Sequence, residues 1–195
     1  MMQCNNNKRQ TLYIKNMVCD RCIMVVRNLF ESMGISTESV ELGIVCVVTS
    51  VEEDNLYKLR ESLYELGFEL IDDRRQQITE QIKNEIIKLV HHDNGCLKEN
   101  LSDFLTEIMR CEYSQLSKLF SETTGTTIEK YFIAQKIERA KELLFYGELS
   151  LSQIADAMNY SSVAYLSAQF KSVTGETPSS CKKRKQNRRT PLDKI

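Results

Sequence analysis

The sequence predicts an α+β chain. It has an N-terminal ferredoxin-like βαββαβ domain, a long connecting helix, and a C-terminal all-α domain of two helix-turn-helix units joined by a linker helix. Three observations support this prediction. Residues 10–72 alternate between strand and helix periodicity, residues 73–92 carry one apolar helical stripe, and the chain beyond residue 95 contains the same unit twice. The expected domain limits are therefore 10–72, 73–92 and 95–185.

Hydrophobic periodicity predicts each element of the N-terminal domain. Alternating or β-branched segments predict strands at 10–17, 39–42, 44–49 and 68–71. Apolar residues at helical spacing predict two helices. One covers 22–33 and stops at Gly34, and the other stops at Gly67 after an apolar stripe of Leu56, Leu59, Leu63 and Leu66. The resulting β-α-β-β-α-β order matches the ferredoxin-like split motif.

A single apolar stripe runs along the next segment. Ile78, Ile82, Ile86 and Leu89 recur at helical spacing, which predicts a helix of about five turns, roughly 30 Å long. Such a helix either packs on its own chain between two domains or pairs with the same helix of a second copy. We expect a homodimer through the 73–92 helix, with packing on its own chain as the alternative.

An internal repeat organises the C-terminal part of the chain. Each copy begins with a typical helix N-cap residue, Asn100 or Ser150, and continues with a short helix, a turn and a second helix that ends at Thr-Gly. Two short helices joined by a tight turn indicate a helix-turn-helix. The identical pairs at an offset of 50 residues are Leu101/Leu151, Ser102/Ser152, Leu116/Leu166, Ser117/Ser167, Phe120/Phe170, Thr124/Thr174, Gly125/Gly175 and Thr127/Thr177.

A continuous helix is predicted between the two copies, over residues 128–146, with Ile133, Ile137, Ala140 and Leu144 on one stripe. Its length of roughly 28 Å is close to the ~34 Å between successive major-groove faces of B-DNA. The second helices of the two units could therefore enter adjacent major grooves. The alternative is a helical repeat that binds protein, but such solenoids need at least three repeats.

The second copy, LSQIADAMNYSSVAYLSAQFKSVTGETP from residue 151, resembles the C-terminal signature of AraC/XylS-type transcription regulators. The segment KIERAKELL at 136–144 resembles the linker helix of that family, and the resemblance covers about residues 96–184. It implies a sequence-specific DNA-binding domain, with double-stranded operator DNA as partner and RNA polymerase as a candidate second partner. Asn159-Tyr160 replaces the usual Gly-Phe of the turn, which should survive because Asn tolerates a left-handed conformation.

The resemblance also assigns the residues that would face DNA. The first recognition helix would be 113–121 and the second 162–171, and we expect the first to carry most of the direct base readout, because Gln can bind adenine and Lys can reach guanine. Alanines in the second can contact only thymine methyl groups, and basic residues beyond it would contact phosphates. The candidate DNA-binding residues are Ser114, Gln115, Ser117 and Lys118, then Ala164, Tyr165, Ala168 and Lys171, then Lys182, Lys183 and Arg184.

A second motif, Met17-Val18-Cys19-Asp20-Arg21-Cys22, lies between the first predicted strand and helix. Two thiols at this spacing can converge on one soft metal ion, and a helix N-terminus favours the thiolate. With the Gly67-Phe68 pair before the last strand, the region resembles the heavy-metal-associated domain of copper chaperones and metal-pumping ATPases. This resemblance implies that Cys19 and Cys22 bind Cu(I) or a similar soft ion. The alternatives are a domain that keeps the fold without metal transfer, and a redox switch at the two cysteines.

Composition excludes several classes of protein. The 195 residues are 42% hydrophobic and 27% charged, with no apolar run long enough for a membrane span, no visible signal peptide and no catalytic motif. Residues 171–195 carry 8 basic and 2 acidic side chains, which fits a polyanion partner as well as a solvated tail. We expect a cytoplasmic transcription regulator that is not an enzyme and that responds to metal or thiol state at Cys19/Cys22. The alternative is a copper chaperone-like protein whose helical half docks a protein partner.

Overall fold

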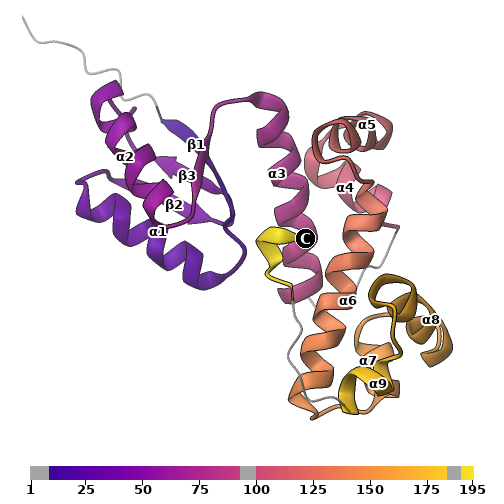
Figure 1. Cartoon of the computed structure of the whole chain (residues 1–195). Coiled ribbons are helices and arrows are strands. Elements are labelled where there is room, and N and C mark those ends of the chain that lie inside the picture. Colours follow the sequence, from indigo (N-terminus) through magenta and orange to yellow (C-terminus); the bar gives the residue numbers. More distant parts are fainter. Residues whose placement is uncertain (1–8, 93–99, 184–189) are drawn as a thin grey trace, which may run out of the picture. The chain divides into compact units, whose positions relative to one another are not determined.

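A computed structural model describes residues 9–92, 100–183 and 190–195. The chain forms two compact units, Met1–Asn84 and Glu85–Ile195, and each is described by itself (Figure 1). The division falls inside a helix, whereas the sequence places the end of the connecting helix at residue 92. The limits 10–72, 73–92 and 95–185 stay predictions. Mixed α+β architecture, with a small antiparallel sheet followed by a helical half, is confirmed.

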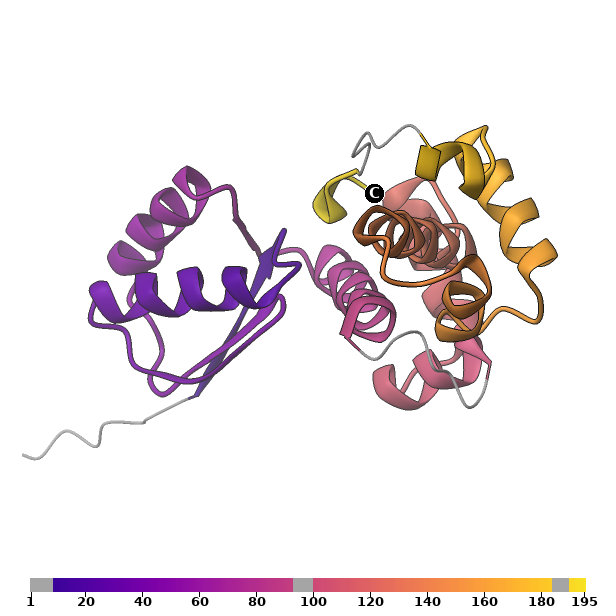
Figure 2. The same cartoon turned by 90° about the horizontal axis from the view of Figure 1, so that it is seen from below.

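The N-terminal unit is a four-stranded antiparallel sheet with two helices. The strand order is β2-β3-β1-β4, so β1 and β3 are central and β2 and β4 are the edges. Helices α1 and α2 lie together over one face of the sheet (Figure 2). In chain order the elements are β1 (Gln10–Lys15), α1 (Asp20–Ser32), β2 (Thr37–Glu41), β3 (Ile44–Val47), α2 (Glu53–Glu65) and β4 (Glu69–Ile71). This is the order that the periodicity predicts.

The core of this unit lies between the sheet and its helices. The strands contribute alternate residues, such as Leu12 and Ile14, because successive side chains of a strand point to opposite faces. The helices contribute Val26, Phe30, Leu59 and Leu63, which are fully buried. The apolar stripes of α1 and α2 are wider than the faces of these helices that are buried in the structure. Leu66, a member of the predicted stripe, is 49% exposed and lies at the C-cap, beyond the last helical turn of α2. Val25, next to the buried Val26 in α1, is 38% exposed.

The turn between β2 and β3 contacts the helix that follows the sheet. Gly43 has φ +75°, and a Cβ atom there would lie 2.0 Å from Nδ2 of Asn84. The same Asn84 amide donates a hydrogen bond to the Leu42 carbonyl at 3.2 Å, and its side chain is buried. Only glycine permits both the left-handed backbone and this close approach.

The connecting helix α3 (Arg74–Ile87) continues into a π-helical turn, η1 (Lys88–His92). Within the C-terminal unit, this turn packs against α6 (Ile128–Tyr146). Ile86 and Leu89, two members of the predicted dimer seam, are 0% and 3% exposed in the single chain. Their apolar surface is already covered without a second copy, so this part of the stripe is not a free dimer seam. The alternative of packing on the same chain accounts for it.

The C-terminal unit is arranged around the long helix α6, which has the predicted bounds. Helices α4 and α5 lie at one end of α6, and α7, α8 and α9 lie at the other (Figure 1). The remaining elements are α4 (Leu101–Met109), α5 (Tyr113–Thr124), α7 (Leu151–Ala157), α8 (Val163–Thr174), α9 (Pro178–Lys183) and the short 3-10 helix η2 (Leu192–Lys194).

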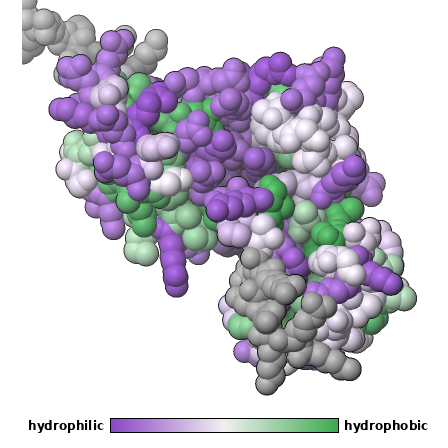
Figure 3. All heavy atoms as spheres, viewed as in Figure 1, coloured by the Kyte–Doolittle hydropathy of each residue, from purple (hydrophilic) through white to green (hydrophobic). Residues whose placement is uncertain are grey.

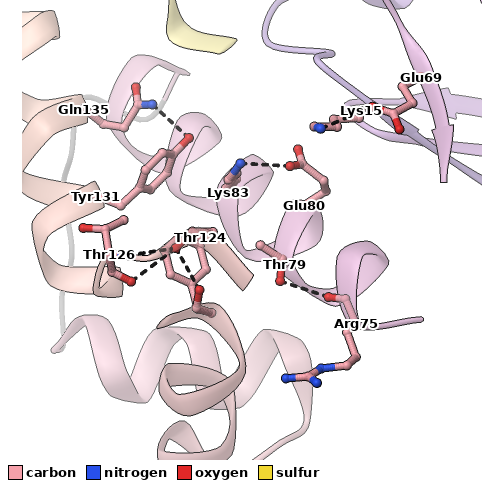
Figure 4. A network of polar contacts seen from close by, with 11 residues as sticks. Lys15, Glu69, Arg75, Thr79, Glu80, Lys83, Thr124, Thr126, Tyr131 and Gln135 are labelled. Carbon is pink, nitrogen blue, oxygen red and sulfur yellow. Dashed lines mark hydrogen bonds and ion pairs between the residues drawn. The ribbon is translucent and has the colours of Figure 1, made fainter. Parts of the chain in front are cut away.

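The internal repeat is also a structural repeat. Helices α5 and α8 begin and end 50 residues apart, and so do the first residues of α6 and α9. Each copy ends its second helix in the same way. A left-handed glycine, Gly125 or Gly175, follows a threonine whose hydroxyl donates back into the helix. Thr124 donates to the Phe120 carbonyl at 2.7 Å (Figure 4). Thr174 donates in the same way to the Phe170 carbonyl at 2.8 Å. The two copies therefore end their second helices with the same C-cap.

The N-caps of the two copies differ. Ser150 forms a capping box with Gln153, as its residue type predicts. Asn100 is the N-cap residue of α4, as predicted, but it makes no side-chain cap hydrogen bond. The fold of the first copy depends on its buried residues, such as Leu105 and Phe120.

Hydrophilic side chains predominate on the face shown in Figure 3. Across the parts of the chain that the structure describes, no helix has the length and apolar character needed to cross a membrane.

Candidate nucleic-acid interface

Helix α5 has one buried face and one exposed polar face. Leu116 and Phe120 point into the core, 3% and 0% exposed, and fix the rotation of the helix. Ser114, Gln115 and Lys118 are exposed, and Ser117 is half-buried at the margin of that face. Because residues three and four apart share a face of a helix, Ser114, Gln115 and Lys118 form one polar surface. The structure thus places these four predicted residues together on α5, as a surface that can donate and accept hydrogen bonds.

Helix α8 presents the equivalent face with different chemistry. Leu166 and Phe170 are buried as their counterparts are in α5, and Ala164, Tyr165 and Ala168 are exposed. The Tyr165 ring meets the Tyr160 ring edge-on, with centroids 5.8 Å apart. This surface offers methyl groups and one aromatic ring where α5 offers an amide and an ammonium group.

Basic residues follow on α8 and beyond it. Lys171, in the last turn of α8, and Lys182, in α9, are exposed. Lys183 ends α9, but its side chain is outside the described part, and Arg184 lies outside the described residues altogether. Two of the four predicted phosphate contacts can therefore be placed on the surface of this unit.

The turns between the paired helices adopt left-handed backbone conformations. Arg110 has φ +50° in the first turn and Asn159 has φ +53° in the second. The expectation that Asn159 can replace the glycine of the second turn is confirmed, because Asn is one of the few residues that tolerate this conformation.

The first turn also contains a contact that the sequence interpretation missed. The Cys111 thiol donates to Oε1 of Gln115 at 3.4 Å, across one helical turn. The i, i+4 spacing of the two residues is a signal that could have indicated it. Gln115 is thus oriented by a neighbouring side chain on the face predicted to read bases.

A polar cluster joins α6 to the elements around it. Gln135, 0% exposed, donates through Nε2 to the Tyr131 hydroxyl at 2.9 Å (Figure 4), and its Oε1 lies 3.0 Å from Nε2 of His91 in the π-helical turn. The Tyr113 hydroxyl at the start of α5 hydrogen-bonds to Glu129 of α6. Burial and this carboxylate raise the pKa of Tyr113. The His91 and Tyr113 hydrogen bonds thus join α6 to the π-helical turn and to α5.

The second helix-turn-helix packs against α6 around a buried cation. Lys136 is 9% exposed, and its ammonium nitrogen lies 3.9 Å from the centroid of the Tyr160 ring and 5.5 Å from that of Phe132. Burial lowers the pKa of Lys136 to about 8. Burial also raises the pKa of Tyr160, and its hydroxyl donates to Oε1 of Gln169 in α8 at 2.5 Å. Lys136, part of the segment that resembles the family's linker helix, thus packs beneath the second turn.

The predicted thiol pair lies in the N-terminal unit, where α1 begins. The Cys19 and Cys22 sulfur atoms are 3.5 Å apart and both residues are half-buried. Met17, two residues before Cys19, is 1% exposed. The expectation of a lowered thiol pKa is wrong for Cys22. Burial raises its pKa more than the backbone hydrogen bonds to Val18 and Cys19 lower it. Among the described residues, no group of three or more His, Cys, Asp or Glu side chains could hold a metal ion.

Known proteins of several lengths match parts of this chain. A helix-turn-helix domain family model matches residues 105–184. The Msm operon regulatory protein of Streptococcus mutans is 28% identical over 145 residues, 72% of this chain and 51% of that protein. The xylose operon regulatory protein of Escherichia coli K12 is 31% identical over 94 residues, 48% of this chain and 24% of that protein. The chain thus spans about half the length of the first relative and a quarter of the second.

A solved structure of a transcriptional regulator with an AraC-type DNA-binding domain, from Chromobacterium violaceum, superposes with a TM-score of 0.48 at 22% identity, covering 56% of this chain and 96% of that one. The matched segment of the family model coincides with the two structural repeats and the linker helix between them. The C-terminal half of this chain contains a helix-turn-helix domain.

Proposed function

We propose that the chain is a sequence-specific DNA-binding regulator of transcription. One observation carries the proposal: two copies of a helix-turn-helix, each with an exposed face on its second helix, lie at the two ends of a 19-residue helix. Nineteen residues span roughly 28 Å, close to the ~34 Å between major-groove faces on one side of B-DNA. The buried contacts at both ends of α6 support a fixed spacing between the two exposed faces.

The chemistry of the two faces supports different roles in recognition. Gln115 and Lys118 on α5 can hydrogen-bond adenine and guanine edges, and Ser114 adds a permissive donor and acceptor. The alanines of α8 can contact only thymine methyl groups, so this helix would read DNA chiefly by shape, with Lys171 and Lys182 on phosphates. The proposed site is thus read mainly at one end.

The experiment is selection of bound fragments from genomic DNA by the full chain, followed by titration of the recovered site. Gln115→Ala and Lys118→Ala should each weaken binding by roughly 1–3 kcal/mol and relax specificity. Lys182→Ala should weaken all sequences alike and reduce the salt dependence. Lys130→Ala, which removes an exposed cation from α6, is the matched control for Lys118→Ala and should leave the affinity unchanged.

Two outcomes would contradict this assignment. Equal affinity of the wild type and the Gln115→Ala/Lys118→Ala variant for the selected site would reject α5 as the reading helix. Failure to recover any preferred sequence would favour the alternative, a protein whose helical half docks a protein partner. Transcription from the selected site with purified RNA polymerase, with and without the chain, would test that enzyme as the second partner.

We further propose that the N-terminal unit is a heavy-metal-associated-like domain of ferredoxin type that senses a soft metal ion. The β-α-β-β-α-β order with strand order β2-β3-β1-β4 supports the fold assignment, and the 3.5 Å separation of the Cys19 and Cys22 sulfur atoms supports the site. Two converging thiols fit a soft ion such as Cu(I), whereas a structural zinc site takes four ligands. The half-buried cysteine pair is accessible enough for exchange of the ion.

Cu(I) competition with a chromophoric chelator tests the site, and DNA titration with and without Cu(I) tests sensing. Cys19→Ser/Cys22→Ser should abolish metal binding, leave DNA binding without metal intact, and remove the response. Metal binding with unchanged DNA affinity would reject sensing by altered affinity. If the wild type binds no thiophilic metal under reducing conditions, the metal site is rejected. A response to peroxide that both serines abolish would then favour the redox switch.

A further inference from the structure

The N-terminal unit contains a groove that neither proposed function uses. It lies between helix α2 and the edge strand β4 and has a volume of about 710 Å³. This volume falls in the range of small-molecule sites, roughly 300–1,000 Å³. Its lining includes aromatic and acidic side chains, namely Tyr57, Glu61, Tyr64, Glu65, Phe68 and Glu69.

The aromatic side chains supply exposed ring surface. Tyr57 and Tyr64 are 63% and 78% exposed, and Phe68 is nearly buried at 7%. The two tyrosines are seven residues apart in α2, which places them on one face with about 10 Å between them along the helix axis. Exposed aromatic rings beside a hollow can attract a cation through their faces.

The acidic side chains give the groove an excess of negative charge. Glu61 and Glu65 lie one turn apart on the same face of α2, and no cationic side chain of the described residues pairs with either one. Glu61 instead hydrogen-bonds to the Tyr57 hydroxyl and raises the pKa of Tyr57. The groove's own cation, Arg60, is engaged elsewhere, since it binds Asp72 at 2.7 Å and the Leu70 carbonyl at 3.0 Å.

The backbone around the groove argues against an added peptide strand. Carbonyls at and just before the edge strand already have side-chain donors. The Gly67 carbonyl accepts from Asn16 at 2.9 Å, the Leu70 carbonyl from Arg60, and the Ile71 carbonyl from Gln77 at 2.9 Å. Strand addition depends on free main-chain groups at a sheet edge. Recognition in this groove is therefore left to ring faces and carboxylates.

We propose that the groove between α2 and β4 binds a small aliphatic polyamine. Its ammonium groups would lie at Glu61 and Glu65, about 6 Å apart along the helix, and its methylene chain would lie along the rings of Tyr57 and Tyr64. The site is separate from the Cys19/Cys22 pair and from the helix-turn-helix surface. Its occupancy can therefore be measured without DNA or metal.

The test is calorimetric titration of the full chain with spermidine at physiological ionic strength, where exposed charges are screened beyond about 8 Å. We expect saturable 1:1 binding. Glu61→Gln/Glu65→Gln should weaken it at least about tenfold, whereas Glu31→Gln/Glu107→Gln, with the same change in net charge at exposed positions elsewhere, should leave it unchanged. Tyr64→Phe should retain binding because the ring face remains, and Tyr64→Ser should weaken it.

Three results would overturn the proposal. Equal weakening by the Glu31→Gln/Glu107→Gln control would mean diffuse attraction to an acidic surface. Equal binding of an aliphatic diol of the same length would mean an apolar groove without preference for cations. Absence of saturation by millimolar spermidine would mean no site. Melting curves of all variants show whether a loss of binding comes from a loss of fold, and an unfolded glutamine variant is replaced by Glu65→Gln alone.

Discussion

The Lys136 ammonium nitrogen lies 3.9 Å from the centroid of the Tyr160 ring, in the interior of the C-terminal unit. The two residues come from the linker helix and from the second turn, so the contact joins the repeat unit to the helix that sets its position. Burial disfavours the charged form of Lys136, whereas the ring faces favour it. The pH at which this lysine loses its proton therefore measures which effect is larger.

Stability should rise with pH around this contact. The folded pKa of Lys136, about 8, is below the ordinary 10.5, so the unfolded state binds more protons between these values and the free energy of unfolding increases. Between pH 8 and 9.5 the gain should be on the order of 2 kcal/mol, and Lys136→Met should abolish it. Above pH 10 the raised pKa values of Tyr113 and Tyr160 act in the opposite direction.

Side-chain NMR of the lysines checks this directly, because one signal should titrate near pH 8 and be missing from Lys136→Met. Denaturant unfolding of both proteins from pH 7 to 9.5 gives the stability difference. If the signal titrates near 10.5, the ring faces compensate fully for burial and the prediction fails.

Among the glycines in the described part of the chain, Gly43 should be the one least tolerant of substitution. Gly43→Ala introduces both left-handed strain and a Cβ atom 2.0 Å from the Asn84 amide, whereas Gly34 has a similar φ of +70° with nothing within 4 Å. Gly34→Ala should cost about 1 kcal/mol and Gly43→Ala roughly 2 kcal/mol more. Adding Asn84→Ala to Gly43→Ala should recover part of the difference. Urea unfolding of these three variants and of Asn84→Ala alone gives the coupling between Gly43 and Asn84. Equal costs at the two glycines would be inconsistent with the close approach.

The connecting helix should respond to charge by unfolding rather than by dissociation. Ile86 is fully buried in the single chain, so Ile86→Glu buries an unpaired carboxylate and should destabilise the protein by several kcal/mol. Gln76→Glu introduces the same residue at an exposed position of α3 and should have little effect. Light scattering paired with thermal melting distinguishes the cases. A well-folded Ile86→Glu protein with half the wild-type mass would instead support a homodimer through this helix.

Periodicity predicts the elements of this chain well, because most of them bury one regular face. The bounds of α6 are those expected from its stripe, and the offset of 50 residues reappears in the limits of α5 and α8. The left-handed Asn159 could be predicted because few residue types accept that conformation.

Features that depend on long-range packing could not be predicted. No local pattern indicates that Asn84 meets the turn at Gly43, or that Gln135 meets His91. The pKa of Cys22 was expected to fall because helix position was the only factor visible, whereas burial is the larger one. The exposure of Val25 also depends on how much of α1 the sheet covers.

The two exposed faces should be exchangeable, because their helices occupy equivalent positions in the repeat. Ala164, Tyr165 and Ala168 correspond at an offset of 50 to Ser114, Gln115 and Lys118. The triple variant Ala164→Ser/Tyr165→Gln/Ala168→Lys gives α8 the hydrogen-bonding groups of α5 while leaving the buried Leu166 and Phe170 unchanged. Sequences selected from a random DNA library should then show the α5 half-site twice, one helical turn apart.

Val173→Gln, which adds an amide group to an exposed position of α8 outside the predicted face, serves as the control and should select the wild-type site. The packing beneath the grafted face does not change, so a folded triple variant tests the face alone. If that variant still selects the wild-type site, α8 does not lie in the major groove with this face. The second helix-turn-helix would then contact only the phosphates of the DNA backbone, through Lys171 and Lys182.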